Sequence, residues 1–314
     1  MYMTAFLFTP TQRLLTSPFL QELPEPVAAA RGVRLLLWRD DLVSPKLPGN
    51  KARKLKYNLL EARRLGHSKF LTFGGAYSNH LAAVAAAGRL HGFATVGLVR
   101  GEAAAPPNPT LARCAADGMA LHYLDRPTYR RRAEPAFLAE MQAQFGPAYL
   151  LPEGGTNALA LKGMAELSAE IRQQVAFDAL AVAVGTGGTL AGLLTGLRGP
   201  ETAVGVAALK NGGFLRADID ALTQAATGQV FANYALATGY HFGGYAKYST
   251  GLMSFVQHFE DRHGVLLDPI YTGKLLFGVL DLIEQGYFRP GSTVVAVHTG
   301  GLQAWAGWHT RFGE

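Results

Sequence analysis

Residues 180–189 read Leu180-Ala181-Val182-Ala183-Val184-Gly185-Thr186-Gly187-Gly188-Thr189, and a second apolar run follows at 190–194. This order is typical of a strand, a glycine-rich turn and a helix, and the backbone N–H groups of such a turn bind phosphate. No Gly-Lys-Ser/Thr follows, and Leu190 replaces the last glycine of the dinucleotide-binding pattern. A small phosphate monoester therefore fits this loop better than a dinucleotide. An ordinary glycine-rich turn remains the alternative.

A lysine stands at another predicted loop-to-helix junction. The segment reads Pro48-Gly49-Asn50-Lys51-Ala52-Arg53-Lys54-Leu55 and follows a strand-like run at 35–38. The helix dipole and the neighbouring Lys54 both favour a neutral Lys51 amine, the nucleophile that forms a Schiff base. The periodicity places Leu55, Leu59 and Ala62 on one helix face, and Arg53, Lys54, Glu61 and Arg64 on the other. A solvated lysine is the alternative reading of Lys51.

A third segment has the same strand–loop–helix order. Gly74-Gly75-Ala76-Tyr77-Ser78-Asn79-His80 follows an apolar run at 70–73 and precedes an Ala-rich helical pattern at 81–90. Ser78 is a good N-cap, and the free N–H groups at a helix start bind anions. A capped helix without a ligand would show the same pattern.

Two more segments place small polar residues beside an apolar element. Leu267-Asp268-Pro269-Ile270-Tyr271-Thr272-Gly273-Lys274 precedes an apolar helical pattern that runs to Ile283. A buried-strand pattern at 294–297 ends in His298-Thr299-Gly300-Gly301. Open α/β sheets bind their ligands at the carboxyl ends of strands, so this cluster is a further candidate for the site.

Five short motifs thus occur in one order along the chain: Gly-Asn-Lys-x-Arg-Lys-Leu from Gly49, Ser-Asn-His from Ser78, Glu-Gly-Gly-Thr-Asn from Glu153, Gly-Thr-Gly-Gly-Thr from Gly185 and Asp-Pro-Ile-Tyr-Thr-Gly-Lys from Asp268. Together they resemble the 1-aminocyclopropane-1-carboxylate deaminase and D-cysteine desulfhydrase family. The resemblance spans nearly the whole chain, from Trp38 to Gly301. It implies a pyridoxal-phosphate enzyme of the tryptophan-synthase β type, also called fold type II.

Composition indicates a globular enzyme with no nucleic-acid partner. The 314 residues are 49% hydrophobic and 17% charged, with a net charge of +6 from scattered basic residues. The dense run Arg130-Arg131-Arg132 lies in a helical stretch with Glu134 and Glu140, which favours a solvated helix face over a nucleic-acid patch.

The sequence also argues against a metal site, a membrane span and export. Cys114 is the only cysteine, so neither an intrachain disulfide nor a cysteine zinc site can form, and H-E-x-x-H is absent. No apolar run reaches the ~20 residues that a membrane span needs. The stretch Met1–Pro10 lacks the features of an export signal. We expect a cytoplasmic protein.

Strand-like and helix-like segments alternate along the chain, which predicts an α/β fold with a mostly parallel sheet and helices on both faces. The predicted strands lie at 34–38, 70–73, 95–99, 120–123, 148–151, 179–184, 202–206 and 293–297. The resemblance implies two lobes with open twisted sheets. The small lobe (51–151) is inserted into a large cofactor-binding lobe (1–50 plus 152–314).

The resemblance also assigns a role to each motif. Lys51 would bond to the cofactor and move the Cα proton, Tyr271 would give or take a proton over the substrate, and Tyr245 would be a second active-site tyrosine. Lys54 and the loop Gly185, Thr186, Gly187, Gly188 and Thr189 would hold the phosphate. Asn79 would donate to the ring 3-oxygen, and the helix start with Ser78, Asn79 and His80 would take the substrate carboxylate, with Ser78 counted among the catalytic residues. For both tyrosines, an amphipathic core residue is the alternative.

Two positions separate the branches of the family. Deaminases that resemble this chain carry Glu where Thr272 stands, and that carboxylate meets the ring nitrogen. A Thr272 hydroxyl at the ring nitrogen would give a weaker electron sink, which suits loss of a good leaving group better than opening of a cyclopropane. The deaminases also carry Gln in place of His80.

Both differences favour α,β-elimination of D-cysteine to pyruvate, ammonia and hydrogen sulfide. A cyclopropane deaminase that yields 2-oxobutyrate and ammonia is the first alternative. Elimination or deamination of another small amino acid, such as serine or β-chloroalanine, and a non-catalytic cofactor-binding sensor or carrier are the others. We expect a homodimer, since symmetric dimers are the commonest oligomers.

Overall fold

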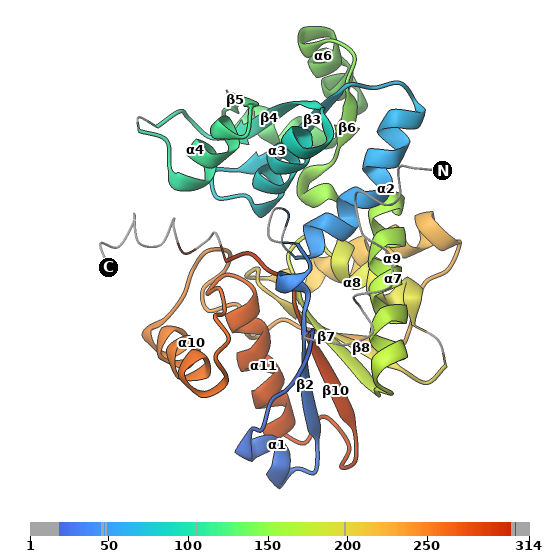
Figure 1. Cartoon of the computed structure of the whole chain (residues 1–314), viewed down its shortest axis with the longest axis vertical. Coiled ribbons are helices and arrows are strands. Elements are labelled where there is room, and N and C mark those ends of the chain that lie inside the picture. The colour runs from blue at the N-terminus through green and yellow to red at the C-terminus, as the bar shows by residue number, and fades with distance from the viewer. Residues whose placement is uncertain are drawn as a thin grey trace.

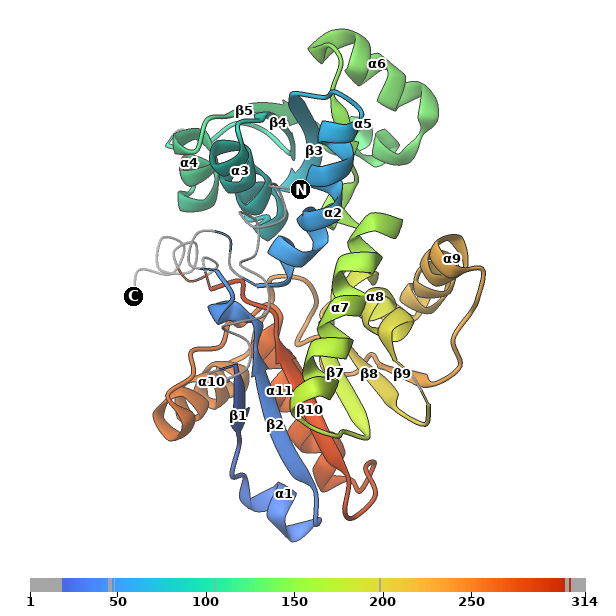
Figure 2. The ribbon, with the colours of Figure 1, turned by 45° about the vertical axis from the view of Figure 1, so that its right-hand side comes forward.

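The computed structural model describes residues 19–44, 47, 49–104, 106–197, 199–302 and 305. Two twisted sheets lie one above the other, and helix α2 (Asn50–Arg64) passes from one toward the other (Figure 1; Figure 2). The stretch Met1–Pro10, which we predicted to lack the features of an export signal, lies outside the described residues. Within the described ranges, every helix is too short or too polar to cross a membrane.

The strands of both sheets are almost all parallel. The larger sheet has the order β1 (Leu20–Glu22), β2 (Arg34–Arg39), β10 (Thr293–His298), β7 (Ala179–Val184), β8 (Thr202–Ala207) and β9 (Tyr234–Ala237). The smaller sheet has the order β5 (Met119–Leu124), β4 (Ala94–Arg100), β3 (Lys69–Gly75) and β6 (Tyr149–Leu151). The pair β1–β2 is antiparallel, and every other described pair is parallel. The predicted α/β class is therefore confirmed.

Strand β7 shows why this sheet is covered on both sides. All six of its residues are buried. Ala179, Ala181 and Ala183 belong to one core cluster, and the alternate Leu180, Val182 and Val184 belong to another. Because successive side chains point to opposite faces, an apolar run without alternation requires helices on both.

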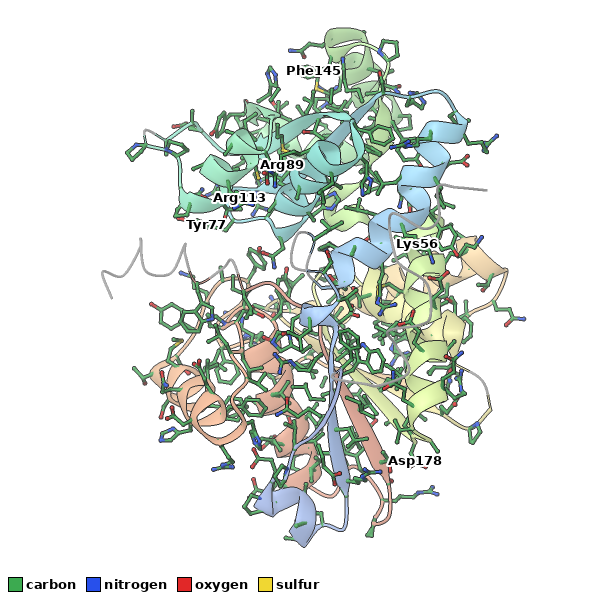
Figure 3. The ribbon with its side chains drawn as sticks, viewed as in Figure 1. Lys56, Tyr77, Arg89, Arg113, Phe145 and Asp178 are labelled. Carbon is green, nitrogen blue, oxygen red and sulfur yellow. The ribbon has the colours of Figure 1, made fainter. Side chains whose placement is uncertain are left out.

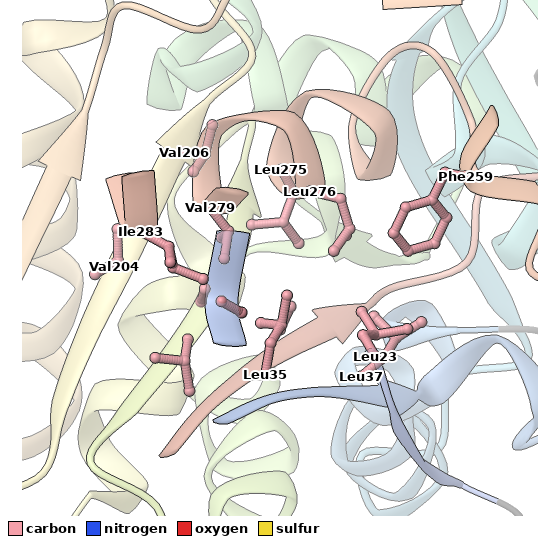
Figure 4. Packing of buried hydrophobic residues seen from close by; sticks show 14 of the residues in the cluster. Leu23, Leu35, Leu37, Val204, Val206, Phe259, Leu275, Leu276, Val279 and Ile283 are labelled. Carbon is pink, nitrogen blue, oxygen red and sulfur yellow. The ribbon is translucent and has the colours of Figure 1, made fainter. Parts of the chain in front are cut away.

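Helices cover both faces of each sheet. On the larger sheet, α1 (Pro26–Ala30), α10 (Thr250–His263) and α11 (Thr272–Glu284) cover one face, and α7 (Ala158–Gln174), α8 (Gly188–Gly196) and α9 (Leu215–Thr227) cover the other. On the smaller sheet, α2, α3 (Asn79–His91) and α4 (Pro109–Ala116) cover one face, and α5 (Arg126–Arg130) and α6 (Pro135–Phe145) cover the other. Figure 4 shows the packing of Leu275, Leu276 and Val279 of α11 in the same cluster as Leu35 and Leu37 of β2. Short 3-10 turns lie at η1 (Asp40–Leu42), η2 (Arg131–Ala133), η3 (Glu153–Gly155) and η4 (Gly212–Phe214).

The predicted strands agree with the structure, and two short strands were missed. All eight predicted segments coincide with strands, to within a residue or two at each end. The missed strands, β1 and β9, have three and four residues and lie at the two edges of the larger sheet. Segments this short have too few residues to show a period.

The two sheets use different parts of the chain. The smaller sheet is built from strands between Lys69 and Leu151, and the larger from strands on either side of that stretch. Helix α2 packs against α7 of the larger unit and also against α3 of the smaller one. The lobe boundaries at 51 and 151 stay a prediction.

The face of α2 that the periodicity assigns to Arg53, Lys54, Glu61 and Arg64 is buried at the first two of these residues. Both side chains are buried, because α2 has neighbours on both sides. Arg53 donates to Asp40 Oδ1 and to Glu170 Oε2, each at 2.8 Å. A buried guanidinium needs such partners, and these two carboxylates supply them.

Candidate active site

The strand order of each sheet reverses once, and the two reversal points face one cavity. In the larger sheet the order reverses between β7 and β10, and in the smaller sheet it reverses between β3 and β6. A cavity of about 960 Å³ is lined by residues that follow all four of these strands. Ligands of open α/β sheets bind at this kind of crevice, so the strand order alone identifies this cavity as the candidate ligand site.

Gly49 and Asn50 set the position of Lys51. Gly49 has φ +73°, and a Cβ there would stand 2.0 Å from the carbonyl oxygen of Thr299, so only glycine fits. The Asn50 N–H donates to that same oxygen at 3.2 Å. The Asn50 side chain donates to Thr189 Oγ1 at 2.9 Å. The start of α2 is thereby tied to the end of β10 and to α8, which places Lys51 in the cavity wall.

Lys51 and Lys54 lie one turn apart and share an acceptor. Lys51 Nζ donates to the carbonyl oxygen of Gly154 at 3.2 Å, and Lys54 Nζ donates to the same oxygen at 2.9 Å. Burial lowers the pKa of Lys51 to about 8. Burial, and then the charge of Lys51, hold the pKa of Lys54 well below its usual value. Near pH 8 a large fraction of Lys51 is therefore the neutral amine, a nucleophile.

The loop after β7 forms a cradle beside Lys54. Gly187 has φ +79°, and a Cβ on Gly188 would stand 2.5 Å from Thr156 Cγ2 and 3.0 Å from Lys54 Nζ. Lys54 Nζ also donates to Thr156 Oγ1 at 2.9 Å, and Thr156 Oγ1 lies 2.9 Å from Thr186 Oγ1. Glycine backbone at a helix start, two hydroxyls and a buried lysine are donors that suit a phosphate dianion.

The start of α3 forms another part of the cavity wall. Ser78 Oγ accepts from the N–H groups of His80 and Leu81, each at 3.2 Å. The cap orients Asn79, whose Nδ2 lies 2.8 Å from where a Cβ of Gly301 would stand, so glycine leaves room for that amide. In Figure 3, Tyr77 lies at the edge of the smaller unit that faces the larger one, one residue before this cap.

The His80 ring is buried and neutral. Thr72 Oγ1 donates to the carbonyl oxygen of Leu151 at 3.0 Å, so its 2.7 Å contact with His80 Nε2 requires that nitrogen to carry the proton. Burial, and then the charges of Lys51 and Lys54, hold the pKa of His80 well below its usual value. Nδ1 is then an acceptor, and no described residue is bonded to it.

Tyr271 packs against the glycine loop, and Tyr245 packs against Tyr271. The Tyr271 and Tyr245 ring centroids are 6.0 Å apart, and the rings meet edge to face. A Cβ on Gly185 would stand 3.1 Å from the Tyr271 hydroxyl. Burial, and then the neighbouring Tyr245, hold the pKa of Tyr271 well above its usual value. Tyr271 therefore keeps its proton and can donate it.

Nearly all of the predicted site residues line this one cavity. They are Lys51, Lys54, Ser78, Asn79, His80, Gly185, Thr186, Gly187, Gly188, Thr189, Tyr245 and Tyr271. Thr272 is the exception. Its side chain is fully buried, and its hydroxyl donates to Asp268 Oδ2 at 2.6 Å. The structure does not bring Thr272 to the cavity wall, because the residue lies in the first turn of α11 and caps it with Asp268.

Other cavity residues had no predicted role. Asn50, Thr156 and Thr299 line the cavity, as do Arg100 and Glu153. Thr156 and Glu153 lie in the Glu-Gly-Gly-Thr-Asn motif, and Thr299 follows β10, so their motifs were the available signals. Arg100 has no motif and could be found only from the sheet register.

The fold and the donor groups of the cavity together indicate which class of cofactor the protein binds. Two mostly parallel sheets enclose a cavity that combines a phosphate cradle with an amine of lowered pKa and a protonated phenol. This donor set suits a cofactor with a phosphate and an aldehyde, since the aldehyde bonds to a neutral amine.

The chain belongs to the family described as pyridoxal-phosphate dependent enzymes, whose sequence pattern matches residues 17–300. A provisionally named 1-aminocyclopropane-1-carboxylate deaminase of Pyrococcus furiosus is 31% identical over 296 residues, which cover 90% of this chain and 89% of that protein. A D-cysteine desulfhydrase of Salmonella newport is 30% identical over 298 residues, which cover 88% of this chain and 90% of that protein. A crystal structure of an ACC deaminase homologue matches with a TM-score of 0.80 at 29% identity. The match covers 90% of this chain and 89% of that one. The predicted family, two-sheet fold type and cofactor are confirmed, and the protein is a pyridoxal-phosphate-dependent enzyme of this deaminase and desulfhydrase type.

Proposed function

We propose that the enzyme catalyses α,β-elimination from a small amino acid, with D-cysteine preferred over the cyclopropane acid. One observation carries the proposal. Among the described residues that line the cavity, the carboxylates are Glu153 and Asp218. Glu153 accepts from Tyr129 at 2.9 Å and from Arg132 at 2.7 Å, and Asp218 lies on the exposed first turn of α9. Glu153 is paired and Asp218 is exposed to solvent, so neither is a buried, unpaired carboxylate of the kind that would keep a ring nitrogen protonated.

The residues that would hold the cofactor follow from the site. Lys54, Thr156 and the loop 185–189 would hold the phosphate, Lys51 would bond to the aldehyde carbon, and Asn79 would donate to the ring oxygen. The start of α3, with Ser78, would take the substrate carboxylate. When bound, pyridoxal phosphate supplies an electron sink for the substrate Cα.

The proton transfers would rest on two side chains. Lys51, with a pKa lowered by burial to about 8, is poised to take the Cα proton near neutral pH. Tyr271 keeps its proton because burial raises its pKa, so it would act as a donor. Tyr245, whose ring packs edge to face against it, would orient it.

Among the described cavity residues, the lack of a buried, unpaired carboxylate favours elimination of a thiol over opening of the cyclopropane ring. Without a carboxylate, the ring nitrogen is less protonated and the sink is weaker. Loss of a thiolate from Cβ needs less electron withdrawal than opening of an unactivated ring. Asp268 does not change this ranking, since both its oxygens accept hydrogen bonds from the first turn of α11.

The test is 2-oxo-acid release from a panel of D- and L-amino acids and the cyclopropane acid. We expect the highest kcat/KM for D-cysteine. A preference for the cyclopropane acid would show that the enzyme is a deaminase. A protein that binds the cofactor but releases no 2-oxo acid from the panel would be a sensor or carrier. The same proposal includes a homodimer in the cytoplasm, and light scattering checks its mass.

A further inference from the structure

Arg100 is a cavity residue that the proposed chemistry does not use. It is the last residue of β4, its side chain is exposed, and it lines the cavity. Its register partner on β3 is Gly75, and Arg100 Nη2 lies 3.5 Å from where a Cβ of Gly75 would stand. The absence of a side chain at Gly75 leaves room for the guanidinium above the loop that leads to Ser78.

The guanidinium has no anionic partner. Among the residues that the structure describes, no carboxylate pairs with Arg100 and no hydrogen bond holds it. Its neighbour is the ring of Tyr129, 5.8 Å from Arg100 Cζ. Arg132 lies 5.0 Å from the same ring, but its charge is paired with Glu153 at 2.7 Å. This wall of the cavity therefore carries one neutralised and one unneutralised arginine.

The other anions expected in the cavity have separate donors. The phosphate cradle is formed by Lys54 and the start of α8, and the α-carboxylate is assigned to the start of α3. Burial raises the pKa of Tyr245, and the charge of Arg100 opposes that rise. An unpaired cation in a concave site attracts anions and binds them through two N–H groups at once.

We propose that Arg100 is a specificity-determining residue that binds an anionic side-chain group of the substrate, so that the preferred substrates are small amino acids whose side chain is anionic or leaves as an anion. This inference rests on the proposed function and narrows it. In elimination from D-cysteine, the Cα–H electron pair forms the new Cα=Cβ bond and the proton passes to the enzyme. The Cβ–S bond breaks with its electron pair on sulfur, and HS⁻ leaves beside the guanidinium.

The test uses a pair of amino acids with the same shape and different charge. Aspartate and asparagine, both enantiomers of each, are titrated into the holoenzyme by calorimetry. Arg100→Gln removes the charge. Arg130→Gln is the matched control, since Arg130 is exposed on the nearby α5 and does not line the cavity. Release of 2-oxo acid from D-cysteine is measured on the same three proteins.

We expect at least one aspartate enantiomer to bind the wild type about tenfold more tightly than the matching asparagine, as a charge-assisted contact would give. Arg100→Gln should bring this ratio to about one, and Arg130→Gln should leave it unchanged. Equal weakening of aspartate and asparagine would show that Arg100 holds the α-carboxylate and would overturn the inference. A wild-type ratio of one, or no binding of either, would also overturn it. Failure of the proposed function is a separate result, because the binding ratio can be ten in a protein that releases no 2-oxo acid.

Discussion

The hydroxyl of Thr272 donates a 2.6 Å hydrogen bond to Asp268 Oδ2 and accepts one of 2.8 Å from the Asp268 N–H. Asp268 Oδ1 accepts from the N–H groups of Ile270 and Tyr271 at 2.9 and 2.8 Å. The two side chains together cap α11 and fix the backbone of Tyr271. The residue expected to touch the cofactor ring therefore supports its neighbour, which lines the cavity.

Thr272→Val should destabilise the protein by about 1–2 kcal/mol, because Asp268 then loses a donor and an acceptor in a buried site. It should also lower kcat, since Tyr271 loses part of its support. Urea unfolding measures the first effect and steady-state kinetics the second. Thr272→Ser keeps the hydroxyl and is the matched control. A Val variant with wild-type stability, or a Ser variant as unstable as Val, would contradict the capping role.

Much of the fold and most of the site residues can be predicted from the sequence because their signals are local. A continuous apolar run such as β7, followed by a glycine loop, specifies its own strand and turn. The motifs around Lys51, Ser78 and Tyr271 name residues that do line one cavity. These predictions depended on neighbours within a few positions along the chain.

The failures depend on contacts between distant segments. The periodicity of α2 separates Arg53 from the apolar face but does not reveal that Arg53 is buried, since its partners Asp40 and Glu170 come from elsewhere in the chain. The direction of the Thr272 side chain depends on the loop that places Asp268. Arg100 reaches the cavity through its register with Gly75, which no local pattern reveals.

Lys51→Ala should abolish turnover and covalent cofactor attachment while the unfolding transition remains cooperative. In the wild type, borohydride reduction and peptide mapping should place the label on Lys51. Because burial lowers the pKa of Lys51 to about 8, the rate at which apoenzyme combines with pyridoxal phosphate should rise with pH and level off above about 8. Label on Lys54 or Lys274, or a rate that still rises toward pH 10, would contradict this assignment.

Gly188→Ala should weaken cofactor binding by about tenfold to a hundredfold, the range expected when a charged hydrogen-bonding partner is displaced. The added methyl would stand 2.5 Å from Thr156 Cγ2 and 3.0 Å from Lys54 Nζ. Fluorescence titration of apoenzyme with pyridoxal phosphate gives the dissociation constant. Gly213→Ala is the control, because a Cβ there meets nothing within 4 Å. Equal affinities for pyridoxal phosphate in the two variants would show that its phosphate does not bind in this cradle.

Lys274 holds the segment that carries Tyr245. Its Nζ is fully buried and donates to the carbonyl oxygens of His241 and Gly244, each at 2.8 Å. Lys274→Met leaves both oxygens without this donor. We expect the displacement of Tyr245 to lower kcat by about tenfold to a hundredfold, with a smaller change in KM. Lys247→Met removes the same charge from an exposed position on the same segment, and it should leave kcat unchanged.

The pH dependence of stability gives an independent test of Lys274. Burial lowers its pKa from 10.5 in the unfolded chain to about 8 in the folded one. Between these values the unfolded state binds more protons than the folded state, so this group makes the free energy of unfolding rise with pH. Below about pH 8 both states carry the proton, and the full cost of burying the charge is present. The stability of the wild type relative to Lys274→Met should therefore increase between pH 8 and pH 10, as measured by urea unfolding at each pH. Lys51 and Lys54 are present in both proteins, so their titration cancels in the difference. A constant difference would mean that the buried ammonium keeps its ordinary pKa, and a falling one that the surrounding carbonyl oxygens raise that pKa, and either result would contradict this prediction.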